Sequence, residues 1–160
     1  MGYHRDQSSR VQAVVDYYGP TDLLNITLDV TDPPGTTMAY DPPESMVSRL
    51  VGFDRSNEGI GVLRRRQDDA AMPIAEKMEL IHLANPISHV TADDPPFFIA
   101  HGTADTVVPL AQSTHLADAL SAANQTPNYV IVPHAGHGLS PDVDDAAIAF
   151  LQQVLRDSEP

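Results

Sequence analysis

The chain has 160 residues, the length of a single domain, and its 42% of hydrophobic residues are sufficient to form a buried core. Its formal net charge of −13 argues against binding to nucleic acids or anionic membranes, since both require a basic face. The absence of cysteine excludes disulfides, and no apolar run approaches the ~18 residues of a membrane-spanning helix. The first ten residues, MGYHRDQSSR, are polar, so we expect no signal peptide, and the compartment stays open.

The first predicted element is a strand in the β-branched and aromatic run VQAVVDYY, which begins at Val11 and ends at Tyr18 before a Gly-Pro pair. Residues 29–72 follow with many prolines and charges, and we expect an irregular insertion that contains at most a short helix at 44–51. The basic cluster of this insertion consists of the three arginines at 64–66. In an acidic chain, we expect these arginines to be exposed or paired locally.

The remainder of the sequence alternates between helical and strand patterns. In chain order, we expect a helix at 73–83, a strand at 97–100, a helix at 110–123, a strand at 129–132, and a helix that begins at Pro141 after a capping Ser140. Short apolar strands joined by helices predict an α/β fold with a short parallel sheet of about three strands flanked by helices. We therefore expect one domain over residues 1–160, with a polar arm at 1–10, the insertion at 29–72 and a strand–helix–strand–helix unit at 95–156.

Two loops that follow neighbouring strands carry the candidate catalytic residues. HGTADTVVP contains Asp105, and PHAGHGLS contains His137 between two glycines. Ligands bind beyond the carboxyl ends of parallel strands, where these loops meet. A carboxylate that accepts a hydrogen bond from one imidazole nitrogen leaves the other nitrogen free to act as a general base. Each residue alone also fits a structural role, but in this order on adjacent strand ends they predict a catalytic pair.

A metal site is the alternative interpretation of the second loop. His134 and His137 form an H-x-x-H pair, which could ligate a metal in a small metal-binding domain. No third ligand with recognisable spacing follows them. We therefore expect neither a metal nor a cofactor.

Several segments together resemble the C-terminal half of the α/β-hydrolase superfamily, in its microbial esterase/lipase branch of acetyl-ester and feruloyl-esterase-like enzymes. The likeness rests on RVQAVVDYYGPTDLL, ANPISHVTADDPPFFIAHG, HGTADTVVP and HAGHG. It covers most of residues 10–155 and is weakest in 29–72. The resemblance implies hydrolysis of small carboxylic esters by Ser-His-Asp acyl transfer, with Asp105 as the acid of the triad and His137 as its base.

The sequence departs from this family at the nucleophile. The family places its serine in G-x-S-x-G before the acid and the base, and neither that motif nor an HGGG-type stretch occurs in the 160 residues. Ser8, Ser9, Ser113 and Ser140 do not lie on a strand-to-helix turn, so we do not expect any of them to replace it. We expect a truncated hydrolase in which the acid and base are present and the missing motifs lie before residue 1. A non-catalytic fragment that persists as an oligomer is the alternative, so whether the chain alone is an enzyme stays open.

Truncation would leave the strand between Val11 and Tyr18 with an open edge. That strand contains one charge, Asp16, and no proline, so little would prevent its edge from associating. We expect a two-fold homodimer that pairs two copies of this strand antiparallel in a continuous six-stranded sheet. Alternatively, residues 29–72 fold over the edge and keep the chain monomeric.

Overall fold

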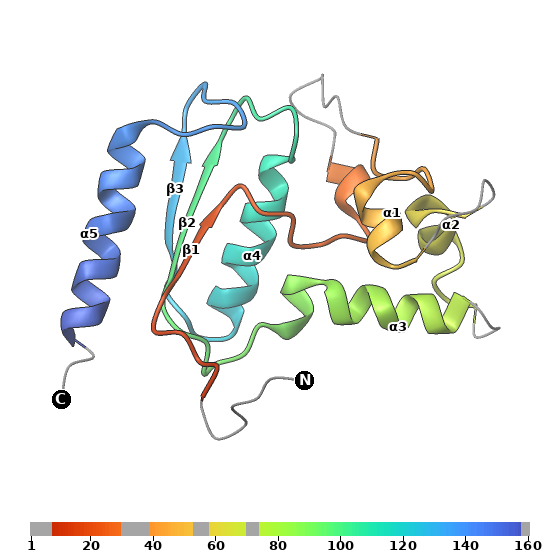
Figure 1. Ribbon diagram of the computed structural model, residues 1–160, viewed down its shortest axis with the longest axis horizontal. Helices are drawn as coiled ribbons and strands as arrows, with labels where there is room; N and C mark the ends of the chain where they lie inside the picture. Colours follow the sequence, from red (N-terminus) through yellow and green to blue (C-terminus); the bar gives the residue numbers. More distant parts are fainter. Residues whose placement is uncertain (1–7, 30–38, 53–57, 70–73, 158–160) are drawn as a thin grey trace.

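The computed structural model describes residues 8–29, 39–52, 58–69 and 74–157. Its elements, in chain order, are β1 (Val14–Tyr17), η1 (Ile26–Asp29), α1 (Met46–Leu50), α2 (Ile60–Arg65), α3 (Ile74–Ala84), η2 (Pro86–His89), β2 (Phe97–Gly102), α4 (Leu110–Ala122), β3 (Asn128–Val132) and α5 (Pro141–Asp157). The sheet lies between α5 on one face and α4 on the other (Figure 1). Within the described ranges, no helix is long and apolar enough to cross a membrane.

The sheet has three parallel strands in the order β1-β2-β3, which confirms the predicted fold class. β2 is central and almost entirely buried, and this explains why its sequence, FFIAHG, does not alternate between apolar and polar residues. Phe98 and Ala100 pack against Val143 and Ala147 of α5, whereas Ile99 faces the core that includes Leu116, Ala117 and Leu120 of α4. Successive side chains of one strand therefore complete two separate cores.

β1 is shorter than the predicted strand. Pairing begins at Val14, and Val11 is 55% exposed. The register places the preceding residues opposite Pro95 and Pro96, which have no N–H to donate to the ladder. At the other end, Tyr18 has a φ of 46°, which ends the extended conformation one residue before the predicted end.

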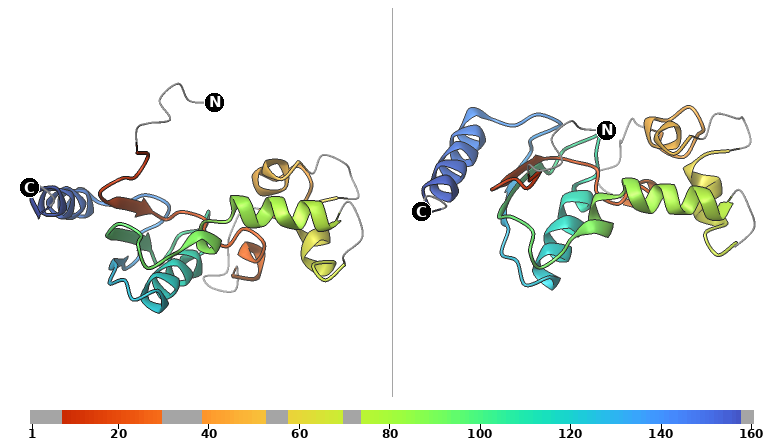
Figure 2. Two further views of the ribbon diagram at one scale, coloured as in Figure 1. Left: turned by 90° about the horizontal axis from the view of Figure 1, so that it is seen from below. Right: turned by 60° about the horizontal axis from the view of Figure 1, so that its bottom comes forward.

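The elements η1, α1, α2 and α3 form a second region, which we call the helical lobe. Figure 2 shows the helical lobe and α5 at opposite ends of the molecule, with the sheet and α4 between them. The lobe has its own apolar core, which includes Ile26, Val51, Leu63 and Ile81. The described part of residues 29–72 is therefore more regular than predicted. α2 was missed because six residues carry too weak a periodic signal, and burial of Ile60 and Leu63 stabilises the helix instead.

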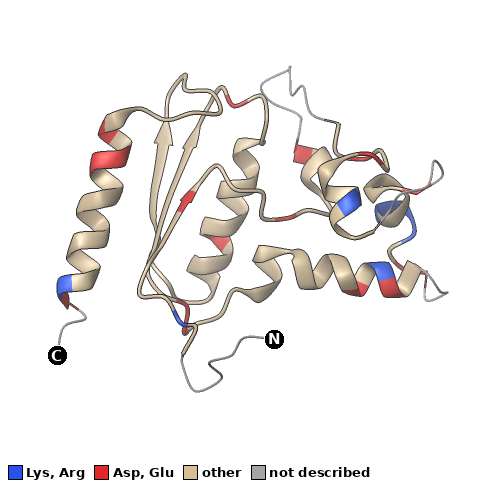
Figure 3. Ribbon diagram, viewed as in Figure 1, with Lys and Arg blue, Asp and Glu red and all other residues tan. Residues whose placement is uncertain are grey.

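Several of the basic residues lie in the helical lobe (Figure 3). Arg64 of the predicted cluster donates a hydrogen bond to Asp41 at 2.6 Å and another to the carbonyl of Leu24 at 3.0 Å. Arg66 pairs with Asp69 at 2.6 Å. Local pairing is thus confirmed for Arg66, whereas Arg64 pairs with a distant residue and ties α2 to the segment before α1.

Candidate active site

The loops that follow β2 and β3 are held together by backbone hydrogen bonds. Both strands end at the same level, because Gly102 is the register partner of Val132. Beyond them, the Thr103 N–H donates to the carbonyl of Val132 at 3.0 Å, and the Ala104 N–H donates to that of Ala135 at 2.8 Å. The two loops therefore form one platform at the carboxyl edge of the sheet.

Gly102 is required for this platform. A Cβ atom at that position would lie 2.2 Å from the carbonyl oxygen of Ala135, and 2.7 Å from that of Gly136. Both contacts are to backbone, which cannot swing aside as a flexible side chain would. The absence of a side chain at the end of β2 thus lets the loop that contains His137 lie directly against residues 103–109, which contain Asp105 and which we call the acid loop.

On this platform, Asp105 and His137 form a hydrogen-bonded pair. Nδ1 of His137 donates to Oδ2 of Asp105 at 2.8 Å. The other oxygen, Oδ1, accepts from the backbone N–H groups of Val107 at 2.7 Å and Val108 at 2.9 Å. Asp105 is 1% exposed, whereas the His137 side chain is 34% exposed. The predicted proximity of the two residues is confirmed, and their catalytic role stays a prediction.

This geometry defines what the imidazole can do. Since a carboxylate oxygen accepts the hydrogen bond, Nδ1 carries the proton and Nε2 retains its lone pair in neutral His137. An imidazole in this tautomer, fixed by a buried carboxylate, can take a proton from a hydroxyl that approaches Nε2. The arrangement is suited to general base catalysis.

A second histidine, His101, forms a hydrogen bond with the backbone of the acid loop. It is fully buried at the end of β2, where Nε2 donates to the carbonyl of Val108 at 3.0 Å and Nδ1 accepts from the Ser113 hydroxyl at 2.7 Å. Burial lowers the pKa of His101, chiefly by desolvation, so the imidazole is neutral. Its 3.4 Å approach to Asp105 is therefore a contact with a neutral N–H and not an ion pair. The sequence signal for it was a histidine within the apolar run FFIAHG.

Two tyrosines also contact the pair of loops, and neither was predicted. The ring of Tyr18 lies against the imidazole of His137, with centroids 4.2 Å apart. Tyr40 comes from the segment before α1, and its hydroxyl donates to the carbonyl of Val107 in the acid loop. Burial, together with the nearby charge of Asp105, raises the pKa of Tyr40 to about 12, so it remains a neutral donor. Periodicity carries no signal for such long-range contacts.

The serines considered as substitutes lie elsewhere. Ser113 is buried within α4 and donates to His101, Ser140 lies next to the start of α5, and Ser8 and Ser9 are exposed. His134, the first histidine of the H-x-x-H pair, donates a hydrogen bond from its backbone N–H to the Thr103 hydroxyl at 2.8 Å. In the described segments, no group of three or more His, Asp or Glu side chains is arranged to hold a metal ion.

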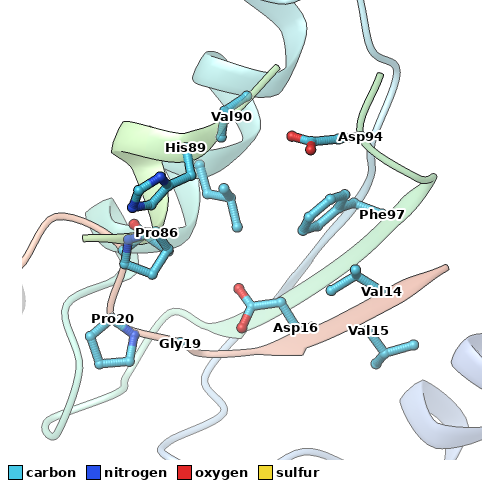
Figure 4. Close-up of a pocket in the computed structure, with 12 residues that line it drawn as sticks. Val14, Val15, Asp16, Gly19, Pro20, Pro86, His89, Val90, Asp94 and Phe97 are labelled. Carbon is cyan, nitrogen blue, oxygen red and sulfur yellow. The ribbon is translucent and has the colours of Figure 1, made fainter. Parts of the chain in front are cut away.

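A separate pocket of about 300 Å³ lies between β1 and η2 (Figure 4). Neither Asp105 nor His137 lines it. The carboxylate of Asp16 points into this pocket, and its Oδ2 atom is buried without a hydrogen-bond partner among the described residues. Burial raises the pKa of Asp16, against a smaller opposing effect of a hydrogen bond with the Gly19 backbone.

A parallel sheet covered by helices on both faces, with a hydrogen-bonded Asp105 and His137 on adjacent strand-end loops, is typical of the α/β-hydrolase architecture. The family model named BD-FAE matches residues 1–120, and the chain belongs to this family. The match includes Asp105 and ends before His137. The predicted resemblance to α/β-hydrolase esterases is thus confirmed at the level of family and fold.

Curated relatives and solved structures agree with this assignment. The chain is 34% identical over 128 residues to Esterase LipQ of Mycobacterium tuberculosis, a match that covers 79% of this chain and 24% of that protein. It is 38% identical over 88 residues to Esterase LipC of the same organism, and this match covers 49% of this chain and 21% of that protein. A truncated form of a carbohydrate esterase from gut microbiota has 26% identity and a TM-score of 0.66, over 97% of this chain and 47% of that one. A thermophilic esterase from Thermogutta terrifontis, at 20% identity, matches in fold, with a TM-score of 0.56 over 92% and 45% of the two chains. The chain thus spans about a quarter of the length of its curated relatives.

Proposed function

We propose that this chain supplies the acid and the base of a carboxylic ester hydrolase. The observation that carries the proposal is the 2.8 Å hydrogen bond from His137 to a buried Asp105 whose other oxygen is held by two backbone N–H groups. Both oxygens are thereby fixed before any substrate binds, so little reorganisation is needed during the reaction. The relatives are named esterases, which supports ester chemistry for the same site.

In this proposal, the reaction proceeds by acyl transfer. Nε2 of His137 takes the proton of a serine hydroxyl as the hydroxyl oxygen bonds to the ester carbonyl carbon, and then gives that proton to the departing alcohol. Water hydrolyses the acyl–serine ester by the same route, with His137 again as base and then as acid. Asp105 keeps the imidazole in the required tautomer and stabilises the imidazolium that forms. No cofactor takes part in these steps.

We propose that the nucleophile comes from outside the 160 residues, because they contain no G-x-S-x-G motif. The chain alone is then expected to show no turnover of short-chain p-nitrophenyl esters and no labelling by a serine-directed phosphonate. Stoichiometric labelling of one of its serines, with turnover that disappears in His137→Ala, would contradict this part of the proposal. The acid–base role would then stand, with an internal nucleophile.

A graft tests the acid–base role itself. The matched region of LipQ is replaced by the corresponding residues of this chain, and ester hydrolysis is measured. We expect activity that falls by about 10⁴-fold in Asp105→Asn, the size of effect seen when a triad acid is removed. Asp118→Asn, an exposed carboxylate on α4, is the matched control and should leave activity unchanged. Hydrolysis that survives both Asp105→Asn and His137→Ala would refute the proposed function.

We also propose a homodimer through the outer edge of β1. β1 is a terminal strand of the described sheet and contains a single charge, Asp16, so its edge can pair with a second copy. Light scattering is expected to show a concentration-dependent dimer that weakens in Val14→Lys and Val15→Lys, since these side chains lie on opposite faces. Val11→Lys, outside the strand, is the control. A monomer at all concentrations would end this proposal.

A further inference from the structure

We propose that Tyr18 is a positioning residue for His137: its ring fixes the imidazole in the orientation that bonds to Asp105. The consequence for catalysis rests on the proposed function, whereas the effect on the imidazole can be measured on this chain directly. Three observations support the proposal: the conformation of Tyr18, the contact between the rings, and the two glycines that flank His137.

The backbone at Tyr18 adopts a conformation that bulky residues avoid. Its φ is 46°, in the left-handed region, where the Cβ atom of an L-residue is crowded. The Tyr18 N–H nevertheless donates to the carbonyl of Ala100 at 2.9 Å, so the residue remains anchored to the sheet. Disfavoured conformations of this kind persist where the surrounding contacts hold them, and they cluster at functional sites. In this chain, the disfavoured conformation occurs at the turn after β1, in a residue whose ring contacts the His137 imidazole.

The ring of Tyr18 contacts both histidines of the site. Its centroid lies 4.2 Å from that of the His137 imidazole, with an interplanar angle of 48°. It lies 6.4 Å from the centroid of His101, nearly edge-on at 83°. His137 is thus held at Nδ1 by Asp105 and on its ring by Tyr18, while Nε2 has no hydrogen bond to the described residues.

The sequence neighbours of His137 do not restrain its imidazole. Its two neighbours are glycines: an added Cβ at Gly136 would meet one atom at 3.8 Å, and one at Gly138 would meet none within 4 Å. Neither of them therefore has a side chain that would hold the imidazole in place. An aromatic contact of this kind corresponds to a factor of about 2 to 12 in the population of one orientation over another.

Imidazole NMR on the isolated chain tests the proposal. We measure the exchange of the His137 Nδ1 proton with water and the tautomer from ring nitrogen shifts. Exchange is expected to be about 2- to 12-fold faster in Tyr18→Leu, with a mixture of tautomers, and unchanged in Tyr18→Phe, which keeps the ring. Tyr18→Gly removes the ring but also relieves the backbone, so a purely structural role predicts a normal His137 in this variant. We expect instead that it behaves like Tyr18→Leu.

Unchanged His137 signals in both Tyr18→Leu and Tyr18→Gly would overturn the proposal, as would a loss in Tyr18→Phe equal to that in Tyr18→Leu. If the variants fail to fold, the contact is tested on the parent chain. The chemical shifts of the His137 ring protons are expected to show the ring current of the nearby Tyr18 ring, and the absence of this ring-current shift would refute the contact. In the active LipQ graft, Tyr18→Leu should lower kcat and leave KM unchanged. A graft that is inactive while His137 responds to Tyr18 would instead overturn the proposed function alone.

Discussion

The sheet region and the helical lobe position their side chains by different means. At the sheet edge, parallel ladders and loop backbone bonds place Asp105 and His137, and Gly102 lets the two loops meet. In the lobe, side chains do this work: Ser48 accepts from the Ile60 N–H at 3.0 Å, in addition to the arginine contacts of α2. The candidate site thus depends on backbone geometry, whereas the lobe depends on its particular side chains.

The two regions are joined through a few buried polar side chains. Gln112 of α4 is fully buried, and its Oε1 accepts from the N–H groups of Thr21 and Asp22, both at 2.8 Å. Its Nε2 donates to Asp29 of η1 at 2.6 Å. Tyr40 makes the second connection, directly to the acid loop. The lobe therefore reaches the candidate site by contacts that can be removed one at a time.

The largest expected effect comes from breaking the lobe core. Leu63→Ala removes a fully buried side chain and should lower the free energy of unfolding by about 2–5 kcal/mol. If the sheet region holds the site on its own, the imidazole signals of His137 stay native below the melting transition. Leu50→Ala, at a 63% exposed position of α1, is the control. Loss of the Asp105–His137 bond in folded Leu63→Ala would show that the site depends on the lobe.

The converse change acts on the backbone of the sheet edge. Gly102→Ala places a Cβ atom against the carbonyl of Ala135, and we expect a cost of about 1–3 kcal/mol together with separation of the two loops. His137 should then lose its hydrogen bond to Asp105, as seen in fast exchange of its Nδ1 proton. Gly138→Ala introduces a Cβ atom with nothing within 4 Å and should change neither quantity. A native His137 in Gly102→Ala would weaken the claim that backbone geometry defines the site.

A smaller effect is expected at the connection between the regions. Tyr40→Phe leaves the Val107 carbonyl without its donor, at a cost of about 0.5–1.5 kcal/mol. Amide hydrogen exchange of Val107 and Val108 should become faster. The matched control is Tyr129→Phe, which removes a hydroxyl contact to Thr114 on the sheet side, at 2.9 Å. Equal exchange in the acid loop of both variants would show that the lobe does not restrain that loop.

The smallest expected effect is a pH dependence that originates in β1. Burial raises the pKa of Asp16, so the folded chain binds this proton more tightly than the unfolded chain does. The resulting stability is fully present below the unfolded pKa and is lost as pH rises through the folded pKa. Denaturant titrations of the parent and Asp16→Asn across the acidic range should differ in slope with this sign. Parallel curves would show that the carboxylate is as well solvated in the folded state as in the unfolded one.

The sequence allowed the sheet, its flanking helices and the Asp105–His137 proximity to be predicted, because strand ends in a parallel sheet meet at one edge. It did not allow α2 to be predicted, since the burial of Ile60 depends on distant segments. The contacts of Tyr18 and Tyr40 were also beyond reach: one requires a left-handed backbone at a non-glycine residue, and the other crosses 67 positions of sequence. The start of β1 at Val14 could not be predicted either, because it depends on two prolines that lie opposite the preceding residues only in the observed register.

The common end of β2 and β3 has a consequence for the evolution of the chain. Asp105 and His137 are 32 positions apart, but their distance is defined by the paired ends of two strands and not by what connects them. Insertions in the turn at 123–127, between α4 and β3, would lengthen that interval without moving either loop. Related chains can therefore acquire extra residues, tags or whole modules there while the acid and base stay in register. A single residue inserted between Gly102 and Asp105 would not be tolerated in this way, because it would shift the carboxylate relative to the imidazole and break their hydrogen bond.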